Sequence, residues 1–200
     1  MLIDIEESQL VLIDYQIKLM PHIFEADEVL ANAVRLAKIA KLLQLPMFGT
    51  EHNPSSLGAT VEVLRALYGR TLAKTFFSAV EDGLVEGLRP EPKPQGGNAR
   101  SLPKHLQKAV PQTAERGTIV IAGCEAHVCL LQTSLDLLEQ EFDVWVVTDA
   151  CSSRTERNRD AAFDRLAGAG AELVTTEMVA FEWLRSSDHV VFRDVLELLK

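Results

Sequence analysis

Short uninterrupted apolar runs recur along the chain and alternate with longer segments in which apolar residues return every three or four positions. The runs lie at residues 10–13, 45–48, 71–73, 119–122, 144–147 and 173–174. A strand of a parallel sheet is covered by helices on both faces, so it carries apolar side chains at consecutive positions rather than at alternate ones. The runs therefore predict strands that are buried on both faces.

The segments between these runs predict helices. The first is expected to begin at Asp27, a favourable N-cap, and to end before Pro46, with apolar residues at helical spacing between them (Val29, Ala33, Leu36, Ala40 and Leu43). Further helices are expected over residues 128–138, from Ser153 or Thr155 to Gly168, and after Asp188 as N-cap. Regular alternation of strands and helices predicts βαβ units, and hence an α/β fold: a three-layer α/β/α sandwich around a mostly parallel sheet.

The size of the chain, 200 residues, fits a single domain spanning residues 1–200. Apolar residues make up 47% of the sequence, enough to form a core, which excludes an intrinsically disordered chain. One stretch rich in Pro and Gly, Arg89–Arg100, cannot form a helix or a central strand. We expect it to be a loop inserted into the domain at about residues 89–100.

The charge of the chain excludes two classes of partner. Lys and Arg number 20 and Asp and Glu 29, so the formal net charge is −9, and the chain lacks the basic face that phosphate backbones and anionic membranes attract. No apolar run approaches the ~18–20 residues of a bilayer span, and Met1–Glu7 carries acids where an export signal carries Lys or Arg. Three cysteines suit a reducing compartment. We therefore expect a cytoplasmic protein that binds neither nucleic acid nor membrane.

Candidate chemistry gathers where the predicted strands end. In an open parallel sheet, ligands bind beyond the carboxyl ends of the strands. Asp14, Lys74 and Cys129 stand at or just past three of these ends. Asp14 follows four apolar residues, so we expect it to be partly desolvated and to need a cation, which Lys74 can supply.

Cys129 is expected in the first turn of the helix that follows the strand at 119–122. The unpaired amides and the positive end of the helix dipole favour a thiolate there, and a nearby ammonium favours it further. We therefore expect a thiol pKa below the ~8.5 of a free cysteine. A thiolate, a carboxylate to take its proton, and amides between Gly123 and Cys129 to hold an oxyanion together suit covalent attack on a carbonyl carbon.

Other roles remain open for these residue types. A cysteine in a globular domain is most often a small buried apolar residue, which is the role expected of the other two cysteines. Cys124, His127 and Cys129 do not have the spacing of established zinc ligands, and neither do Glu51 and His52. The glycines form no phosphate-binding fingerprint, and a Ser-His-Asp triad lacks its nucleophile elbow. The sequence therefore predicts neither a metal nor a cofactor.

Several ordered motifs make the chain resemble a known family. LVLIDYQ contains Asp14, LAKTFFSA contains Lys74 and VIAGCEAHVCLLQTSLDLL contains Cys129, with GTEHNPSSLGATV between the first two and VWVVTDACSSR after the last. Together, over roughly residues 8–185, they resemble the isochorismatase-like cysteine hydrolase superfamily. TEHNPSSLG and DACSSR are most similar to its isochorismatase domain-containing branch. The resemblance implies a six-stranded parallel sheet flanked by helices.

The resemblance also implies roles for the residues that match the motifs. Asp14 corresponds to the aspartate that takes the thiol proton and later passes it to the leaving group, Lys74 to the lysine that lowers the thiol pKa, and Cys129 to the nucleophile. An oxyanion hole is implied at the backbone amides of Cys129 and Glu125. A cis peptide bond is implied between Cys124 and Glu125.

The substrate pocket departs from the family pattern in two places. The nicotinamidase branch binds a metal through an Asp and several His, but this region of the chain offers Glu51 and His52 without a further His, so neither a metal nor nicotinamide is expected. Ala126 stands where many members carry Thr, which changes the polarity beside the oxyanion hole. The expected wall residues are Leu19, Glu51, His52, Phe77 and Ala126.

The first functional hypothesis is a cysteine-dependent hydrolase that cleaves a small amide or related C–N bond through a covalent thioester. Two alternatives remain open. One is an isochorismatase-type vinyl-ether hydrolase, whose chemistry needs an acid and a water but no thiol. The other is a non-enzymatic binding or regulatory module with a residual site. The expected partners are a small-molecule substrate and, by the resemblance, further copies of the same chain in a homo-oligomer.

Overall fold

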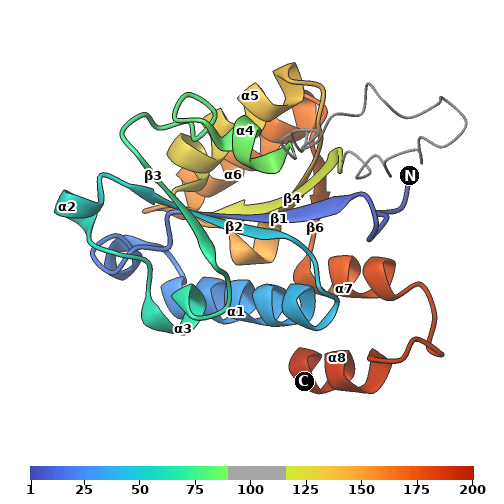
Figure 1. Ribbon diagram of the computed structural model, residues 1–200. Helices are drawn as coiled ribbons and strands as arrows, with labels where there is room; N and C mark the ends of the chain where they lie inside the picture. The colour runs from blue at the N-terminus through green and yellow to red at the C-terminus, as the bar shows by residue number, and fades with distance from the viewer. Residues whose placement is uncertain (90–115) are drawn as a thin grey trace, which may run out of the picture.

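The computed structural model describes residues 1–89 and 116–200, and within them six parallel strands form one sheet (Figure 1). The strand order is β3-β2-β1-β4-β5-β6. The strands are β1 (Ser8–Ile13), β2 (Met47–His52), β3 (Arg70–Lys74), β4 (Thr118–Gly123), β5 (Asp143–Val147) and β6 (Glu172–Val174). The predicted parallel α/β architecture is confirmed. Apart from Arg89, the insertion predicted at about 89–100 lies outside the described residues.

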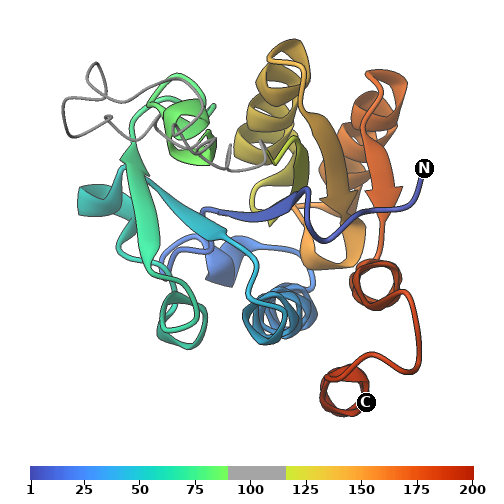
Figure 2. The ribbon, with the colours of Figure 1, turned by 45° about the vertical axis from the view of Figure 1, so that its right-hand side comes forward.

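Helices cover both faces of the sheet and give the three predicted layers (Figures 1 and 2). One face carries α1 (Ala26–Leu42), α3 (Glu62–Arg65) and α7 (Thr176–Leu184), and α8 (Phe192–Leu199) packs against α1 and α7. The other face carries α4 (Leu84–Leu88), α5 (Leu131–Glu139) and α6 (Glu156–Gly168). The shorter elements are η1 (Met20–His22), α2 (Pro54–Leu57), the π-helical turn η4 (Ala126–Leu130) and η5 (Thr148–Ala150). Within the described ranges, no helix is both long and apolar enough for a bilayer crossing.

The central strands β1 and β4 are buried along their whole length. Helices pack on both faces of these strands, so consecutive apolar residues all enter the core, as the unbroken runs predict. β1 pairs with β2 on one side and with β4 on the other, and Ile13 stands opposite both Thr50 and Gly123. The carboxyl ends of these three strands therefore meet at one edge of the sheet.

Gly123 allows β1 and β4 to approach closely at this edge. A Cβ atom at position 123 would lie 2.4 Å from Ile13 Cβ and 2.6 Å from the Ile13 carbonyl oxygen. Since one of these atoms belongs to the backbone, the strands would have to separate. We expect Gly123→Ala to lower the free energy of unfolding in urea by about 3 kcal/mol. Gly168→Ala is the control, because a Cβ there meets nothing within 4 Å; equal losses in both variants would contradict the packing argument.

Two predicted helix starts are wrong. α1 begins at Ala26 with Glu25 as N-cap in the left-handed conformation, so Asp27 lies in the first turn, where its charge faces the positive end of the helix dipole. The last helix begins at Phe192, so Asp188 is not its N-cap. The Asp188 N–H donates to the Ser186 hydroxyl at 3.1 Å, and this local bond favours a turn over a helix start.

Two further elements differ from the sequence prediction. α7 was not predicted, because Thr175 reads equally well as the end of a strand; its hydroxyl accepts a hydrogen bond from the Met178 N–H at 3.3 Å and caps the helix. β2 is displaced from the predicted run at 45–48 to Met47–His52. The displacement carries polar residues of β2 into the sheet edge where the candidate chemistry lies.

Candidate active site

Three predicted site residues come together at the carboxyl edge of the sheet. Asp14 directly follows β1, Lys74 is the last residue of β3, and Cys129 lies in η4, which follows β4. Lys74 Nζ is 2.8 Å from Asp14 Oδ2, and both side chains are fully buried. The Cys129 thiol lies close enough to both groups for each of them to shift its pKa. Parallel strands thus join residues that are far apart in the sequence.

The backbone and a neighbouring hydroxyl hold Asp14. Its φ of 53° turns the chain sharply out of β1. Its N–H donates to the Thr50 carbonyl at 3.3 Å, and the Gln16 N–H donates to the Asp14 carbonyl at 2.8 Å. The Thr50 hydroxyl donates to Asp14 Oδ1 at 2.6 Å. The carboxylate is therefore held in one orientation, and its side chain is buried.

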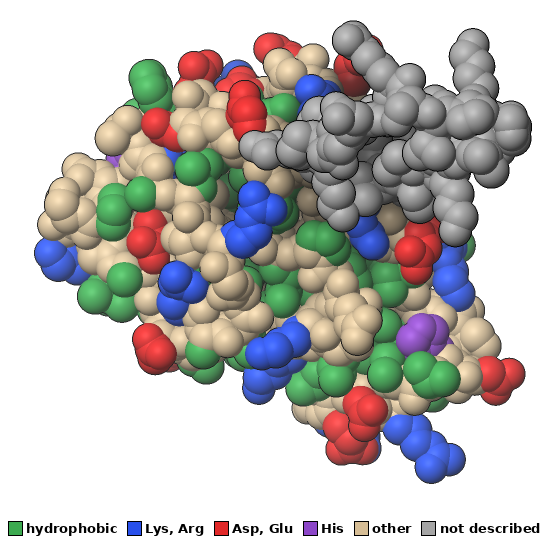
Figure 3. All heavy atoms as spheres, in the orientation of Figure 1, with side chains coloured by type: hydrophobic (Ala, Val, Ile, Leu, Met, Phe, Trp, Pro, Cys, Tyr) green, Lys and Arg blue, Asp and Glu red, His purple; other side chains and the backbone are tan. Residues whose placement is uncertain are grey.

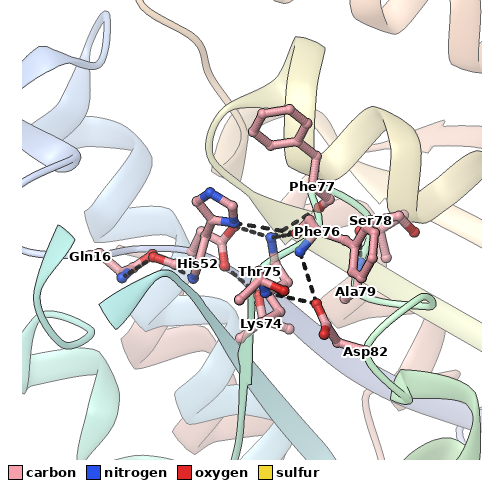
Figure 4. Close-up of polar contacts among 12 residues, drawn as sticks. Gln16, His52, Lys74, Thr75, Phe76, Phe77, Ser78, Ala79 and Asp82 are labelled. Atoms are coloured by element: carbon pink, nitrogen blue, oxygen red, sulfur yellow. Dashed lines mark hydrogen bonds and ion pairs between the residues drawn. The ribbon is translucent and has the colours of Figure 1, made fainter. Parts of the chain in front are cut away.

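The Lys74 ammonium lies against the turn that follows β3 (Figure 4). It donates to the carbonyls of Phe77 at 2.9 Å and Phe76 at 3.2 Å, and its Nζ forms the ion pair with Asp14 Oδ2. The turn that presents these carbonyls is itself held by Asp82, whose Oδ2 accepts from the Thr75 N–H at 2.8 Å and from the Phe76 N–H at 3.0 Å. Two backbone carbonyls and one carboxylate therefore surround the buried ammonium group.

The structure overturns the expected acidity of Cys129. Burial raises the pKa of this thiol, the charge of Asp14 and a hydrogen bond with it raise the pKa further, and Lys74 lowers it; the outcome is a pKa of about 12. The sequence argument included the helix terminus and the ammonium but not the loss of water, and Cys129 is only 6% exposed. A thiol with this pKa is neutral near pH 7, and an attack by its sulfur would require a neighbouring group to accept the proton.

Within the described residues, the backbone amides of Glu125 and Cys129 have no hydrogen-bond acceptor in another element. Among the described residues, the Glu125 N–H makes no hydrogen bond, and the Cys129 N–H makes none outside its own helix. The intervening Ala126 N–H, in contrast, donates to the Ser152 carbonyl at 2.7 Å. The peptide bond between Cys124 and Glu125 is cis, as the resemblance implied. Amides without an internal partner can donate to a developing oxyanion.

The loop after η5 anchors the segment that precedes Cys129. Arg154 Nε and Nη2 lie 2.8 Å and 3.3 Å from Glu125 Oε1 and Oε2. The Ser153 hydroxyl is 2.9 Å from His127 Nδ1. The fully buried Ala126 lies between these two contacts in the chain. The motif DACSSR therefore has a structural reason: its last two residues hold the turn that carries the thiol.

The predicted wall residues divide into two groups. The His52 and Phe77 rings lie 5.3 Å apart, and His52 Nδ1 is 3.3 Å from the Phe76 carbonyl that also receives Lys74 (Figure 4). The Glu51 carboxylate is used elsewhere, because Oε1 accepts from both the N–H and the hydroxyl of Thr60, at 2.8 Å and 2.9 Å. Leu19 is buried at 7% exposure. Phe77 also lines a cavity of about 590 Å³ between the turn at 75–81 and α5, whose lining does not include the Asp14, Lys74 and Cys129 side chains.

No role was predicted for three residues of this region. Thr50 contacts the Asp14 carboxylate, Asp82 holds the turn over Lys74, and Arg154 pairs with Glu125. Thr50 could have been found from the register of β2 against β1, but the predicted strand ended at residue 48. In the described part of the chain, no group of three His, Cys, Asp or Glu side chains is arranged to hold a metal ion.

Sequence relatives cover nearly the whole chain. Residues 8–178 match the family described as Isochorismatase domain. Isochorismatase domain-containing protein 2 of Rattus norvegicus is 32% identical over 195 residues, which is 98% of this chain and 82% of the rat protein. Relatives with this name confirm the branch that the motifs TEHNPSSLG and DACSSR indicated.

Solved structures share the same fold. The MAR1 ribonuclease from Caenorhabditis elegans superposes with a TM-score of 0.83 at 31% identity, covering 100% of this chain and 92% of that one. YcaC from Pseudomonas aeruginosa, solved with hexane-2,5-diol and covalent acrylamide, gives 0.81 at 26% identity, covering 98% and 91%. YcaC from Escherichia coli, described as an octameric hydrolase of unknown specificity, gives 0.76 at 26% identity, covering 99% and 94%. With its motifs, sheet order and full-length relatives in agreement, the chain belongs to the isochorismatase family.

Proposed function

We propose that this protein is a hydrolase that cleaves an amide or related C–N bond of a small molecule through a thioester on Cys129. The observation that carries the proposal is the buried Asp14–Lys74 pair at 2.8 Å, in contact with the thiol of Cys129. A buried ion pair is costly to maintain, and its placement beside a cysteine gives that cysteine a proton acceptor and a fixed cation.

Acylation begins from the neutral thiol. The Cys129 proton moves to Asp14 Oδ2 while Sγ bonds to the substrate carbonyl carbon and the carbonyl π electrons move to oxygen. The oxyanion accepts hydrogen bonds from the Glu125 and Cys129 amides. Once Asp14 is neutral, Lys74 is the remaining charge beside the sulfur and stabilises the negative charge in the transition state. The tetrahedral adduct then collapses, Asp14 returns its proton to the departing nitrogen, and the C–N bond breaks.

Deacylation uses the same groups in reverse order. Asp14, again a carboxylate, takes a proton from a water molecule as the water oxygen bonds to the thioester carbonyl carbon. The second adduct collapses, the C–S bond breaks, and the proton on Asp14 returns to Cys129. One substrate and one water give one acid and one amine, and the site regains its starting protonation state.

A neighbouring structure supports a reactive nucleophile in this family. The YcaC protein from Pseudomonas aeruginosa was solved with covalent acrylamide, and acrylamide adds to nucleophilic side chains, thiolates above all. In this chain Cys129 is the cysteine beside the ion pair, whereas Cys124 and Cys151 are 0% and 1% exposed.

The Caenorhabditis elegans neighbour is named a ribonuclease. That function has less support in this chain. The formal net charge is −9, and on the described part of the face in Figure 3 Lys and Arg side chains are interspersed with Asp and Glu. A polynucleotide needs a continuous basic surface, and it also needs access, which 6% exposure of Cys129 denies. A small-molecule substrate fits the site better.

Assembly into a homo-oligomer is part of the proposal. The Escherichia coli YcaC neighbour is described as octameric, and Phe76 and Phe77 beside Lys74 are 56% and 50% exposed in the single chain. Exposed aromatic residues next to a site suit contact with another copy of the chain.

The thioester is tested by acylation with p-nitrophenyl acetate, an activated acyl donor. We expect a burst of nitrophenolate and an acetyl adduct that peptide mass spectrometry locates on Cys129. Cys129→Ala is expected to lose both, because Cys129 is the thiol whose pKa responds to both Asp14 and Lys74. Cys151→Ala is the matched control and keeps both, since this fully buried thiol lies apart from the ion pair. A Cys129→Ala protein that hydrolyses a substrate of the wild-type protein at an equal rate would instead favour the thiol-independent cleavage of a vinyl ether.

A further inference from the structure

Thr50 is fixed beside Asp14 by the pairing of β1 and β2. It stands opposite Ile13 in the parallel register, and its carbonyl accepts the Asp14 N–H at 3.3 Å. Both Thr50 and Asp14 are 0% exposed. The distance between the two side chains is therefore set by the backbone of the sheet, and their contact is buried.

The two oxygens of the Asp14 carboxylate have different partners. Oδ1 accepts a hydrogen bond of 2.6 Å from the Thr50 hydroxyl. Oδ2 lies 2.8 Å from Lys74 Nζ but receives no well-aligned hydrogen bond from the described residues. The hydroxyl thus occupies one oxygen and leaves the other with a lone pair to spare.

We propose that Thr50 is a positioning residue that reserves Asp14 Oδ2 as the atom that takes the proton of Cys129, an inference that rests on the proposed function. The hydrogen of the Thr50 hydroxyl already points at Oδ1 in this hydrogen bond, so protonation of Oδ1 is disfavoured. After Oδ2 is protonated, Oδ1 becomes the carbonyl-type oxygen of a carboxylic acid and still accepts from Thr50. One hydrogen bond therefore holds the carboxyl group before and after the proton transfer, so the group does not rotate between the two half-reactions.

Two reactions of the Cys129 sulfur distinguish a residue that positions Asp14 from a residue whose loss damages the whole site. Acylation by p-nitrophenyl acetate near neutral pH requires Asp14 to accept the thiol proton, because the pKa of Cys129 is about 12. Alkylation by iodoacetamide at about pH 10 does not, because hydroxide removes the proton from a thiol. A residue that acts by aiming Asp14 affects the first reaction and spares the second, whereas a residue that merely maintains the site affects both.

We expect Thr50→Val, which keeps the shape of the side chain and removes the hydroxyl, to slow acylation about tenfold to a hundredfold. Alkylation at high pH is expected to keep its wild-type rate. Thr50→Ser restores the hydroxyl and should recover acylation, and Thr50→Ala should repeat the loss if the valine variant folds poorly. Thr71→Val on β3 is the matched control, because the Thr71 hydroxyl is buried without a hydrogen-bond partner, and we expect no change in either reaction.

Wild-type acylation rates in both Thr50→Val and Thr50→Ala would overturn the proposal, and so would a parallel loss of acylation and alkylation. Failure of Thr50→Ser to recover acylation would also count against it, since the hydroxyl would then not be the cause. A wild-type protein that releases no nitrophenolate and forms no adduct gives a different result: it refutes the thioester function, and the role of Thr50 falls with it.

Discussion

Replacing Asp14 by Asn is expected to make Cys129 more reactive toward iodoacetamide near neutral pH while it abolishes hydrolysis. The charge of Asp14 and its hydrogen bond both raise the pKa of the thiol, and Lys74 acts in the opposite direction. Without the carboxylate, the thiolate becomes the available counter-ion of Lys74. Removal of a neighbouring charge lowers a pKa by roughly one to three units, so alkylation should accelerate about tenfold to a thousandfold.

Hydrolysis should fall at least about a hundredfold in the same variant, because Asn can neither accept the thiol proton nor return it to the leaving nitrogen. The measurement is the rate of Cys129 alkylation, followed by mass spectrometry across pH, beside the burst with p-nitrophenyl acetate. Asp164→Asn removes an exposed carboxylate on α6 and serves as the control, with both rates unchanged. Slower alkylation of Asp14→Asn would show that the carboxylate promotes the thiolate at rest, contrary to the pKa argument.

The second large effect concerns stability. Lys74→Met is expected to lower the free energy of unfolding by about 3–5 kcal/mol, because it leaves the fully buried Asp14 carboxylate without its counter-ion. The carbonyls of Phe76 and Phe77 lose their donor in the same variant. Urea unfolding at neutral pH measures the loss, with circular dichroism and tryptophan fluorescence as two probes of the same transition.

The double variant Asp14→Asn with Lys74→Met separates the ion pair from the packing around it. Since both charges are gone, we expect it to be more stable than Lys74→Met alone, with a coupling energy of roughly 2 kcal/mol or more. Lys200→Met is the surface control: Lys200 Nζ lies 2.5 Å from Glu197 Oε1, but these side chains are 70% and 71% exposed, and we expect little change. Additive losses in the double variant would mean that the buried charges do not act as a pair.

The sequence was most informative where one local pattern had one structural meaning. Unbroken apolar runs located β1 and β4 because a strand buried on both faces needs no alternation. The rule that ligands bind at the carboxyl ends of parallel strands then predicts that Asp14, Lys74 and Cys129 lie together. The family assignment followed from the motifs around the same three residues.

The errors have a common origin in groups that are distant in the sequence. The acidity of Cys129 was predicted with the wrong sign because burial, the largest influence on its pKa, results from packing of the whole site. Asp82 was not singled out because its partners are the amides of a turn, which have no side-chain pattern. The start of α1 was misplaced because Glu25, a poor cap by composition, adopts a left-handed φ of 56°.

The burial of Cys129 has a consequence for how the protein endures oxidants. Loss of water and the charge of Asp14 raise the pKa of this thiol to about 12 although Lys74 lowers it, so the sulfur is protonated near neutral pH while the site is idle. Peroxide attacks sulfur chiefly in its anionic form. We therefore expect Cys129 to form sulfenic acid more slowly than an exposed cysteine does.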